Sequence, residues 1–244
     1  MVKIVGMFRK VSAKVWTLIF RAFGVDWLSR TRIHSRADLA EIGSRYGGWV
    51  VPTSLLGPNS ICYCVGCGED ISFDLGLIEQ IGCDVYALDP TPRAIEFVSK
   101  RAGDNPQYHF LPTGLWDKKD TLRFYAPRNP DHVSHSITNL QKTDEFISVE
   151  VDRLSNVMRQ LGHENIDLLK IDIEGAEYKV LDSIMTDKIP VQIICVEYDE
   201  TYNPLDDNFR QRIRESVSAL GKAGYVLVCA QGNGNYTFVH SGHA

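Results

Sequence analysis

The sequence predicts an α/β fold in which a mostly parallel, seven-stranded sheet carries helices on both faces. Three observations indicate this architecture. With 244 residues, the chain is long enough for one sizeable core. From residue 60 onward, short apolar runs alternate with helical stretches, which is the pattern of parallel strands joined by crossover helices. The last two runs are joined by Gln-Gly-Asn-Gly-Asn, a linker typical of a hairpin, so we expect the final strand to be antiparallel.

Composition narrows the class of protein. The chain is 44% apolar and 23% charged, which is ordinary for a globular domain and excludes collagenous, coiled-coil and largely disordered classes. A net charge of −5 argues against a nucleic-acid partner, because binding phosphates requires a basic face. The six cysteines are scattered through apolar segments, which favours a cytoplasmic location. Cys62, Cys64 and Cys67 lack a second cluster at zinc-site spacing, so we expect buried thiols and no metal.

Residues 1–50 are predicted to form a separate helical extension that begins with a basic amphipathic helix. Between positions 1 and 24, basic residues such as Lys3, Lys14 and Arg21 would lie opposite apolar residues spaced by three or four. The apolar stretch is too short to span a bilayer, which takes roughly 20 residues. We expect this helix to dock on its own domain, to contact a dimer mate, or to lie on an anionic membrane surface.

The first half of the main domain, which we place at residues 51–244, is expected to hold three parallel strands. They are residues 60–65, 84–88 and 108–111. Thr91 and Pro92 are typical of a helix start, with the threonine hydroxyl as the cap and proline in the first turn. Residues 114–116 should be a loop after the third strand.

The second half is expected to contain an insertion and then the rest of the sheet. Two strand-like pieces flank the polar loop 127–143 and should lie over the sheet edge: residues 122–125 and 146–151. The apolar run 166–171 should be a buried central strand. Beyond it we expect a strand at residues 191–196 and a helix at 209–220. The closing hairpin should consist of strands 225–229 and 236–239.

A glycine-rich turn follows the first predicted strand. Gly66 and Gly68 would let backbone N–H groups approach a polar ligand, although the third glycine of G-x-G-x-x-G is replaced by Ile71. Asp89 stands 21 residues after Gly68, at the end of the second strand, where a carboxylate can accept both hydroxyls of a ribose. These features fit either NAD or S-adenosylmethionine (SAM).

A longer motif separates these two cofactors. Residues 151–181 contain Asp-Arg-Leu near the start and Leu-Leu-Lys-Ile-Asp-Ile-Glu-Gly-Ala-Glu-Tyr-Lys-Val-Leu at the end. This stretch resembles the FkbM-type SAM-dependent methyltransferases, and the resemblance covers about residues 55–240. It implies a Rossmann-like class I methyltransferase fold, SAM as cofactor, and O-methylation of small molecules, sugars or lipid-linked groups. A nicotinamide-binding sheet would instead continue with another crossover helix.

The resemblance also implies roles for individual residues. Gly66 and Gly68 would contact the methionine end of SAM, Asp89 would hold the ribose, and Gly114 and Leu115 would lie by the adenine. The other residues assigned to the cofactor site are Val65, Cys67, Asp70, Pro90 and Asp172. Family members often have Asp-Val-Gly in the first loop, whereas this chain has Cys64 before Val65, so Glu69 or Asp70 is expected to anchor the methionine amino group.

Four side chains are candidates to orient or deprotonate an acceptor hydroxyl: Asp172, Glu174, His135 and Glu197. Three of them follow strands whose carboxyl ends should meet at the ligand-binding edge of the sheet. Tyr46 and Trp49 are expected to pack on the domain rather than to cover the site. Two other functions remain open at this point, an NAD-dependent oxidoreductase and a SAM-fold scaffold that binds without turnover.

Overall fold

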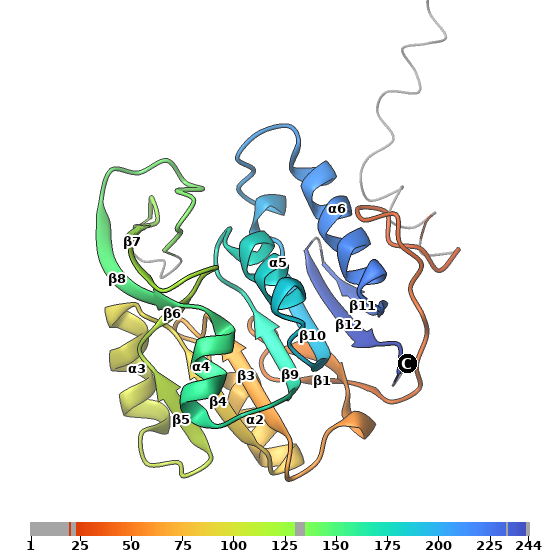
Figure 1. Cartoon of the computed structure of the whole chain (residues 1–244), viewed down its shortest axis with the longest axis horizontal. Coiled ribbons are helices and arrows are strands. Elements are labelled where there is room, and N and C mark those ends of the chain that lie inside the picture. Colours follow the sequence, from red (N-terminus) through yellow and green to blue (C-terminus); the bar gives the residue numbers. More distant parts are fainter. Residues whose placement is uncertain (1–19, 21–22, 130–134, 233, 243–244) are drawn as a thin grey trace, which may run out of the picture.

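The predicted seven-stranded sheet is present in the computed structural model, which describes residues 20, 23–129, 135–232 and 234–242 (Figure 1). Its strand order is β11-β12-β10-β9-β3-β4-β5. Five neighbouring strands are parallel, and β12 is antiparallel to both β10 and β11. The strands are β3 (Ile61–Val65), β4 (Asp84–Leu88), β5 (Tyr108–Leu111), β9 (Ile166–Ile171), β10 (Val191–Glu197), β11 (Tyr225–Gln231) and β12 (Asn235–His240).

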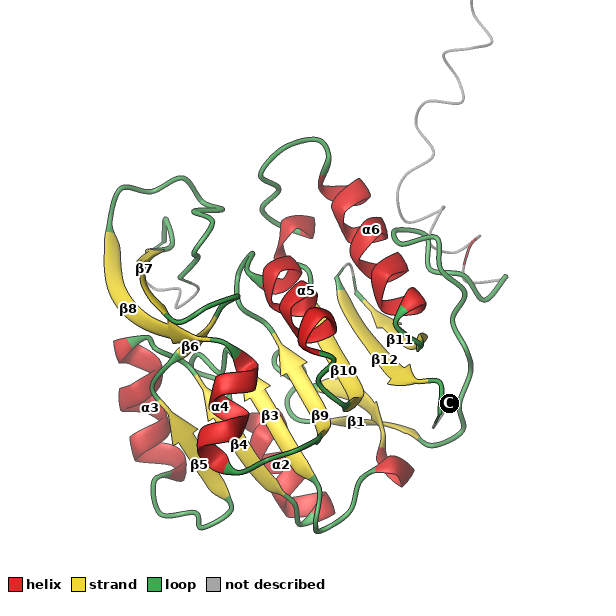
Figure 2. Ribbon diagram, viewed as in Figure 1, coloured by secondary structure: helices red, strands yellow, loops and turns green. Residues whose placement is uncertain are grey.

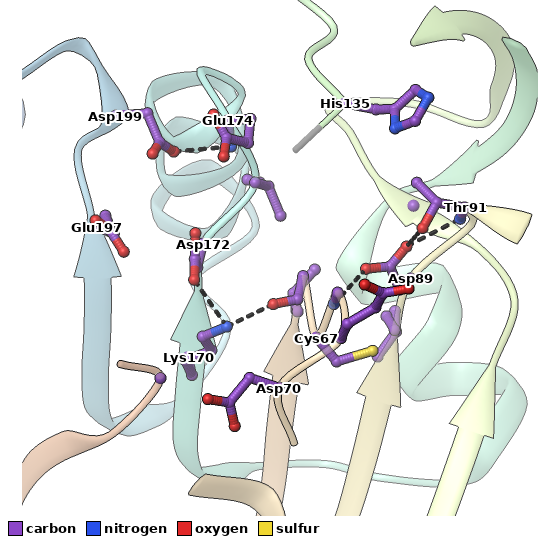
Figure 3. A pocket seen from close by; sticks show the side chains of 18 of the residues that line it. Cys67, Asp70, Asp89, Thr91, His135, Lys170, Asp172, Glu174, Glu197 and Asp199 are labelled. Carbon is purple, nitrogen blue, oxygen red and sulfur yellow. Dashed lines mark hydrogen bonds and ion pairs between the residues drawn. The ribbon is translucent and has the colours of Figure 1, made fainter. Parts of the chain in front are cut away.

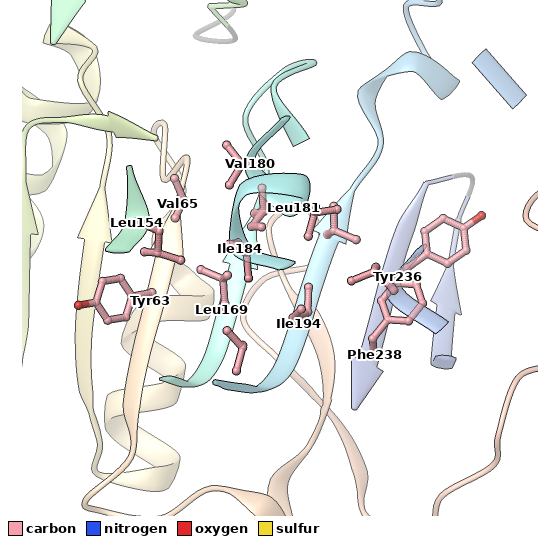
Figure 4. Close-up of a cluster of buried hydrophobic side chains, with 14 of the residues drawn as sticks. Tyr63, Val65, Leu154, Leu169, Val180, Leu181, Ile184, Ile194, Tyr236 and Phe238 are labelled. Atoms are coloured by element: carbon pink, nitrogen blue, oxygen red, sulfur yellow. The ribbon is translucent and has the colours of Figure 1, made fainter. Parts of the chain in front are cut away.

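Helices cover both faces of this sheet, as predicted (Figure 2). One face packs against α4 (Leu154–Leu161), α5 (Glu177–Asp187) and α6 (Phe209–Lys222). The other packs against α2 (Ser72–Ile81) and α3 (Pro92–Ala102). Figure 4 shows the first cluster, where Leu169 and Ile194 of the central strands contact Val180 and Ile184 of α5. Helix α4 was not predicted from the sequence, because its three buried apolar residues make only a short stripe.

The segment before residue 53 differs from the prediction. Residues 39–52 form the antiparallel pair β1 (Leu39–Ile42) and β2 (Trp49–Pro52) instead of a helical extension. Trp49 and Val51 are buried in the core on the α2 face, so this pair is packed onto the sheet domain. Their apolar side chains alternate with the strand period of two, a signal too short to outweigh the predicted helix. The predicted basic helix at positions 1–24 lies outside the described residues except at positions 20, 23 and 24.

The insertion forms its own three-stranded sheet, in the order β6-β8-β7. Its strands are β6 (Gly114–Leu115), β7 (Asp120–Tyr125) and β8 (Phe146–Asp152). The prediction of a loop at 114–116 was therefore wrong at its first two residues, which pair with Val151 and Asp152 in parallel. Only tertiary pairing defines so short a strand. Two 3-10 turns, η2 (Thr53–Leu55) and η3 (Asp199–Thr201), complete the described elements.

Candidate functional site

A cavity of about 900 Å³ opens at the carboxyl ends of β3, β4, β9 and β10 (Figure 3). This is the edge at which doubly wound sheets bind their ligands. Every residue proposed from the sequence for cofactor binding or catalysis lines it: Val65, Gly66, Cys67, Gly68, Asp70, Asp89, Pro90, Gly114, Leu115, His135, Asp172, Glu174 and Glu197. Their roles stay predictions, but the fold brings them to one place.

Position 66 requires glycine because two loops approach each other closely there. Its φ is +78°, and a Cβ at this position would lie 1.7 Å from the backbone carbonyl oxygen of Asp172. No side chain fits in that space, so the turn after β3 and the turn after β9 are in direct backbone contact. Gly68 also has a positive φ, of 51°. The two glycines thus place bare backbone at the floor of the cavity.

Asp89 is buried and held by three donors. Its Oδ2 accepts the backbone N–H of Gly68 at 3.0 Å. Its Oδ1 accepts the backbone N–H of Thr91 at 2.9 Å and the Thr91 hydroxyl at 2.6 Å. The Thr91 hydroxyl was expected to cap α3, and this expectation was wrong because the hydroxyl orients the carboxylate instead. Asp89 therefore has a fixed orientation toward the cavity that it lines.

Lys170 is a functional candidate that the sequence analysis missed. Its Nζ lies 3.1 Å from Asp172 Oδ2 and donates to the carbonyl oxygen of Gly66 at 2.5 Å. The residue is 6% exposed. Burial lowers the pKa of this ammonium, but the carboxylates of Asp172 and Asp74 outweigh that effect, so its pKa is raised and it stays charged. The signal was visible in the sequence as a lysine inside the apolar run 166–171, whose other charged residue is Asp167.

The turn that carries Glu174 is held from three sides. Glu174 has a φ of +54°, a strained conformation for a residue with a side chain. Its backbone N–H donates to Asp199 Oδ2 at 2.9 Å, and the N–H of Gly175 donates to Glu177 Oε1 at 2.7 Å. The hydroxyl of Ser136, in the insertion, donates to the Glu174 carbonyl oxygen at 2.5 Å. The insertion and η3 together fix the position of this turn.

The carboxyl groups on this side of the cavity favour their protonated forms. Burial, and then the negative charge of Asp172, raises the pKa of Glu197 to about 8. Burial and the adjacent carboxyl of Glu177 raise the pKa of Asp199 well above its ordinary value. Burial likewise raises the pKa of Glu177. Because these groups lie together, the cluster holds protons at neutral pH.

His135 and the acids of the first loop lie elsewhere around the cavity. Figure 3 shows His135 above Thr91, on the Asp89 side and away from Glu197 and Asp199. Glu69, one expected anchor for an amino group, forms an ion pair with Arg93 at 2.7 Å. That leaves Asp70 as the better-placed anchor of the two.

Asp70 is already bound by serines of two elements. It accepts the Ser44 hydroxyl at 2.7 Å and the backbone N–H of Ser72 at 2.9 Å. Burial raises the pKa of this carboxyl, but the hydrogen bonds from Ser72 and Ser44 outweigh burial and lower it overall. Cys64, where the family often has aspartate, is fully buried in β3 and does not line the cavity. An acid there would lie under the site rather than in it.

Tyr46 and Trp49, which were expected to behave alike, differ in the structure. Trp49 packs in the core as expected, whereas Tyr46 is 90% exposed and lines the cavity. Tyr202 and Asn235 also line it and were not predicted.

Within the described ranges, no group of three or more His, Cys, Asp or Glu side chains is arranged to hold a metal ion. None of the described helices is long and apolar enough to cross a membrane.

The profile of the methyltransferase FkbM domain matches residues 51–227. This chain belongs to the FkbM methyltransferase family. The match covers the sheet from β3 to the start of β11 and includes both the Gly66 loop and the Asp172 turn. The chain therefore contains an FkbM methyltransferase domain with the Rossmann-like class I fold, as the sequence predicted.

The relatives are distant, and the chain spans less than two thirds of the length of each of the three described next. It is 27% identical over 132 residues to probable methyltransferase-like protein 24 of Homo sapiens, covering 54% of this chain and 30% of that protein. It is 23% identical over 158 residues to the 2-O-methyltransferase NoeI of Sinorhizobium fredii, covering 59% of this chain and 65% of that protein. The solved FkbM methyltransferase of Methylobacillus flagellatus KT has a TM-score of 0.48 and 12% identity, covering 78% of this chain and 48% of that one.

Proposed function

We propose that this protein transfers the methyl group of SAM to a hydroxyl of an acceptor. The observation that carries the proposal is the meeting of three features at one cavity: the Gly66 turn, the oriented Asp89 carboxylate and the Asp172 carboxylate. They lie at the ends of β3, β4 and β9, which are adjacent in the sheet. A cofactor held by the first two would present its reactive end to the third.

The residues on the Asp89 side fit a nucleoside with a polar tail. Bare backbone at Gly66 and Gly68 admits close contact with an amino-acid moiety. Asp89 can accept a further hydrogen bond from a ribose hydroxyl, since a carboxylate has about four acceptor positions and three are occupied. Gly114 lies among the side chains of Val151, Phe124 and Pro90, and with Leu115 it forms an apolar part of the lining that suits an adenine ring. Bound SAM would supply a methyl group already activated by a positively charged sulfur.

On the other side of the cavity, Asp172 is the residue that would orient the acceptor. Its ion pair with Lys170 keeps a carboxylate oxygen at the floor, where it can accept a hydrogen bond or the proton of a hydroxyl. Glu197 suits a different role, because a carboxyl with a pKa of about 8 is protonated at neutral pH and donates a hydrogen bond. Orientation can supply roughly 7–11 kcal/mol and a base about 3–5 kcal/mol, so alignment should dominate.

A hydroxyl acceptor is supported by the residue types of this side and by one relative. Carboxyl groups and Asn235 can pair with hydroxyls, and Tyr46 and Tyr202 expose rings beside them. The relative from Sinorhizobium fredii is named a 2-O-methyltransferase. We propose a small-molecule, glycan or lipid-linked acceptor.

The test begins with equilibrium binding of SAM, its demethylated product and NAD by titration calorimetry. We expect both sulfur compounds to bind and NAD not to bind. Pools of small molecules, glycans and lipids would then be incubated with methyl-labelled SAM and analysed by mass spectrometry. Label on an oxygen supports the proposal. Label on nitrogen or carbon, binding of NAD alone, or binding of SAM with no transfer to any pool would overturn it.

A further inference from the structure

The buried ammonium of Lys170 lies at the cavity floor, between the two sides of the site (Figure 3). Lys170 is on β9, on the face that packs against α2, and its Nζ reaches up to the carboxyl end of the strand. There it contacts Asp172 at 3.1 Å and the Gly66 carbonyl at 2.5 Å. One cation thus touches both the turn that would hold the cofactor and the carboxylate that would face the acceptor.

The groups that face this ammonium are mostly acidic or neutral. Asp172, directly after β9, and Asp74 on α2 are the two carboxyl groups that raise its pKa most, and the Cys64 thiol of β3 is neutral because burial raises its pKa. Asp74 is buried and accepts the Tyr108 hydroxyl at 3.0 Å. Burial raises the pKa of Asp74 above its ordinary value in spite of Lys170. Asp172, which lines the cavity, is therefore the partner whose charge Lys170 chiefly balances.

The charge of Asp172 matters because of what surrounds it. Glu174, Glu197 and Asp199 line the same part of the cavity. Among the described residues that line the cavity, the permanent cations are Lys170 and Arg45, and Arg45 is exposed. If the floor carried an unbalanced carboxylate, it would attract any cation in the cavity and repel its neighbouring acids.

We propose that Lys170 is a positioning residue that neutralises Asp172 and fixes it against the Gly66 turn. The pair presents an oriented oxygen without net charge, so a positively charged methyl donor is not held more tightly than its neutral, demethylated product by this part of the floor. Lys170 therefore sets the relative affinity for donor and product. This inference rests on the proposed use of SAM.

A purely structural ion pair makes a different prediction. If Lys170 only stabilised the two turns, its loss would weaken the binding of both ligands by the same factor. If it balances charge, its loss adds one negative charge near the sulfur, which favours the sulfonium of SAM over the neutral product. A unit charge at the floor should change the ratio of the two affinities by roughly three- to tenfold.

The experiment measures dissociation constants of SAM and of its demethylated product by titration calorimetry, on the full chain, for Lys170→Met and related variants. Lys170→Met should weaken both ligands and raise the product-to-SAM ratio of dissociation constants about three- to tenfold. Asp172→Asn should lower that ratio, because it leaves Lys170 unbalanced. The double variant Lys170→Met/Asp172→Asn, which has neither charge, should return the ratio to the wild-type value.

Arg153→Met is the matched control. Arg153 makes an ion pair with Asp187 at 2.6 Å and neither residue lines the cavity, so its loss should reduce stability and leave the ratio unchanged. If Lys170→Met does not fold, Asp172→Asn and the charge-balanced double variant still test the inference. An unchanged ratio in Asp172→Asn, or a double variant that fails to restore the ratio, would overturn it. If the wild-type chain binds neither sulfur compound, the proposed function itself fails, which is a separate outcome.

Discussion

The two sides of the cavity are built on different principles. On one side, the Asp89 carboxylate accepts three hydrogen bonds. The donors are the backbone N–H of Gly68, the backbone N–H of Thr91 and the Thr91 hydroxyl. On the other side, Glu177, Glu197 and Asp199 crowd together, and burial raises the pKa of each. The first side has donors that match its carboxylate, whereas the second has more carboxyl groups than cations to balance them.

The difference shows how each side obtains its properties. Three donors hold Asp89 in one orientation, so that side is a rigid receptor. The acidic side depends on protons and on Lys170, so its hydrogen-bonding character changes with pH. Changes of shape on the Asp89 side should therefore abolish SAM binding. Changes of charge on the acidic side should mainly reduce the rate of methyl transfer. Four experiments test this division.

Asp172→Asn should have the largest effect. It removes the proton-accepting oxygen while preserving shape, so the single-turnover rate with the acceptor found by labelled transfer should fall about 10²–10⁴-fold. Affinity for SAM should change by less than about tenfold, because the residue lies on the acidic side. Glu164→Gln, which removes one carboxylate at an exposed position shortly before β9, is the control for the loss of charge alone. Wild-type turnover in Asp172→Asn would exclude a catalytic role and direct attention to Glu174.

Gly66→Ala should disrupt the turn after β3, on the Asp89 side of the cavity. The new methyl group would collide with the Asp172 carbonyl at 1.7 Å, and the φ of +78° adds strain. We expect about 2–4 kcal/mol of lost unfolding free energy and no measurable SAM binding. Gly162→Ala is the control, since its φ is +75° with nothing within 4 Å of the added carbon. If denaturant titration gives the two variants equal losses, the backbone contact between the turns is not as tight as described.

Asp89→Ala should weaken SAM binding by roughly 1.5–3 kcal/mol, because it removes charge-assisted acceptors for ribose hydroxyls. Turnover at saturating SAM should recover, which distinguishes this side from Asp172. Asp84→Ala, at the amino end of the same strand, should leave the affinity intact. Titration calorimetry decides the matter, and unchanged affinity in Asp89→Ala would remove this residue from the cofactor site.

Glu197→Gln should have the smallest effect, and it tests whether Glu197 is protonated in the folded protein. The folded pKa of Glu197 is about 8 against an ordinary value of 4.5, so the folded chain binds this proton more tightly than the unfolded chain. Its contribution to stability is present below about pH 4.5 and is lost as the pH rises toward about 8. Glutamine cannot ionise, so the variant should lose less stability between about pH 5 and about pH 8.

Denaturant midpoints at the two pH values measure this loss, with exposed Glu164→Gln as the control. Equal pH dependence in Glu197→Gln and the wild type would mean that Glu197 is ionised in the folded protein. The acidic side would then not depend on bound protons, and the proposed difference between the two sides would be contradicted.

The sequence predicted the strands of the main sheet closely and the edges of the insertion less well. Apolar runs such as 166–171 have a local period, and residues at their ends must reach the carboxyl edge of a parallel sheet, so Asp89, Asp172 and Glu197 could be placed before any coordinates. Strand β6 has two residues and exists only because Gly114 pairs with Val151. No sequence window contains that information.

What the sequence determined by itself is therefore the fold class, the family and the group of side chains that meet at the cavity, since each follows from local patterns. Tertiary structure decided how those side chains behave. The contact of Lys170 with Gly66 joins residues 104 positions apart, and the contact of Glu174 with Asp199 joins residues 25 apart. Charge, protonation and orientation depend on such neighbours, because electrostatic energies are set by distance in space and by burial rather than by position along the chain.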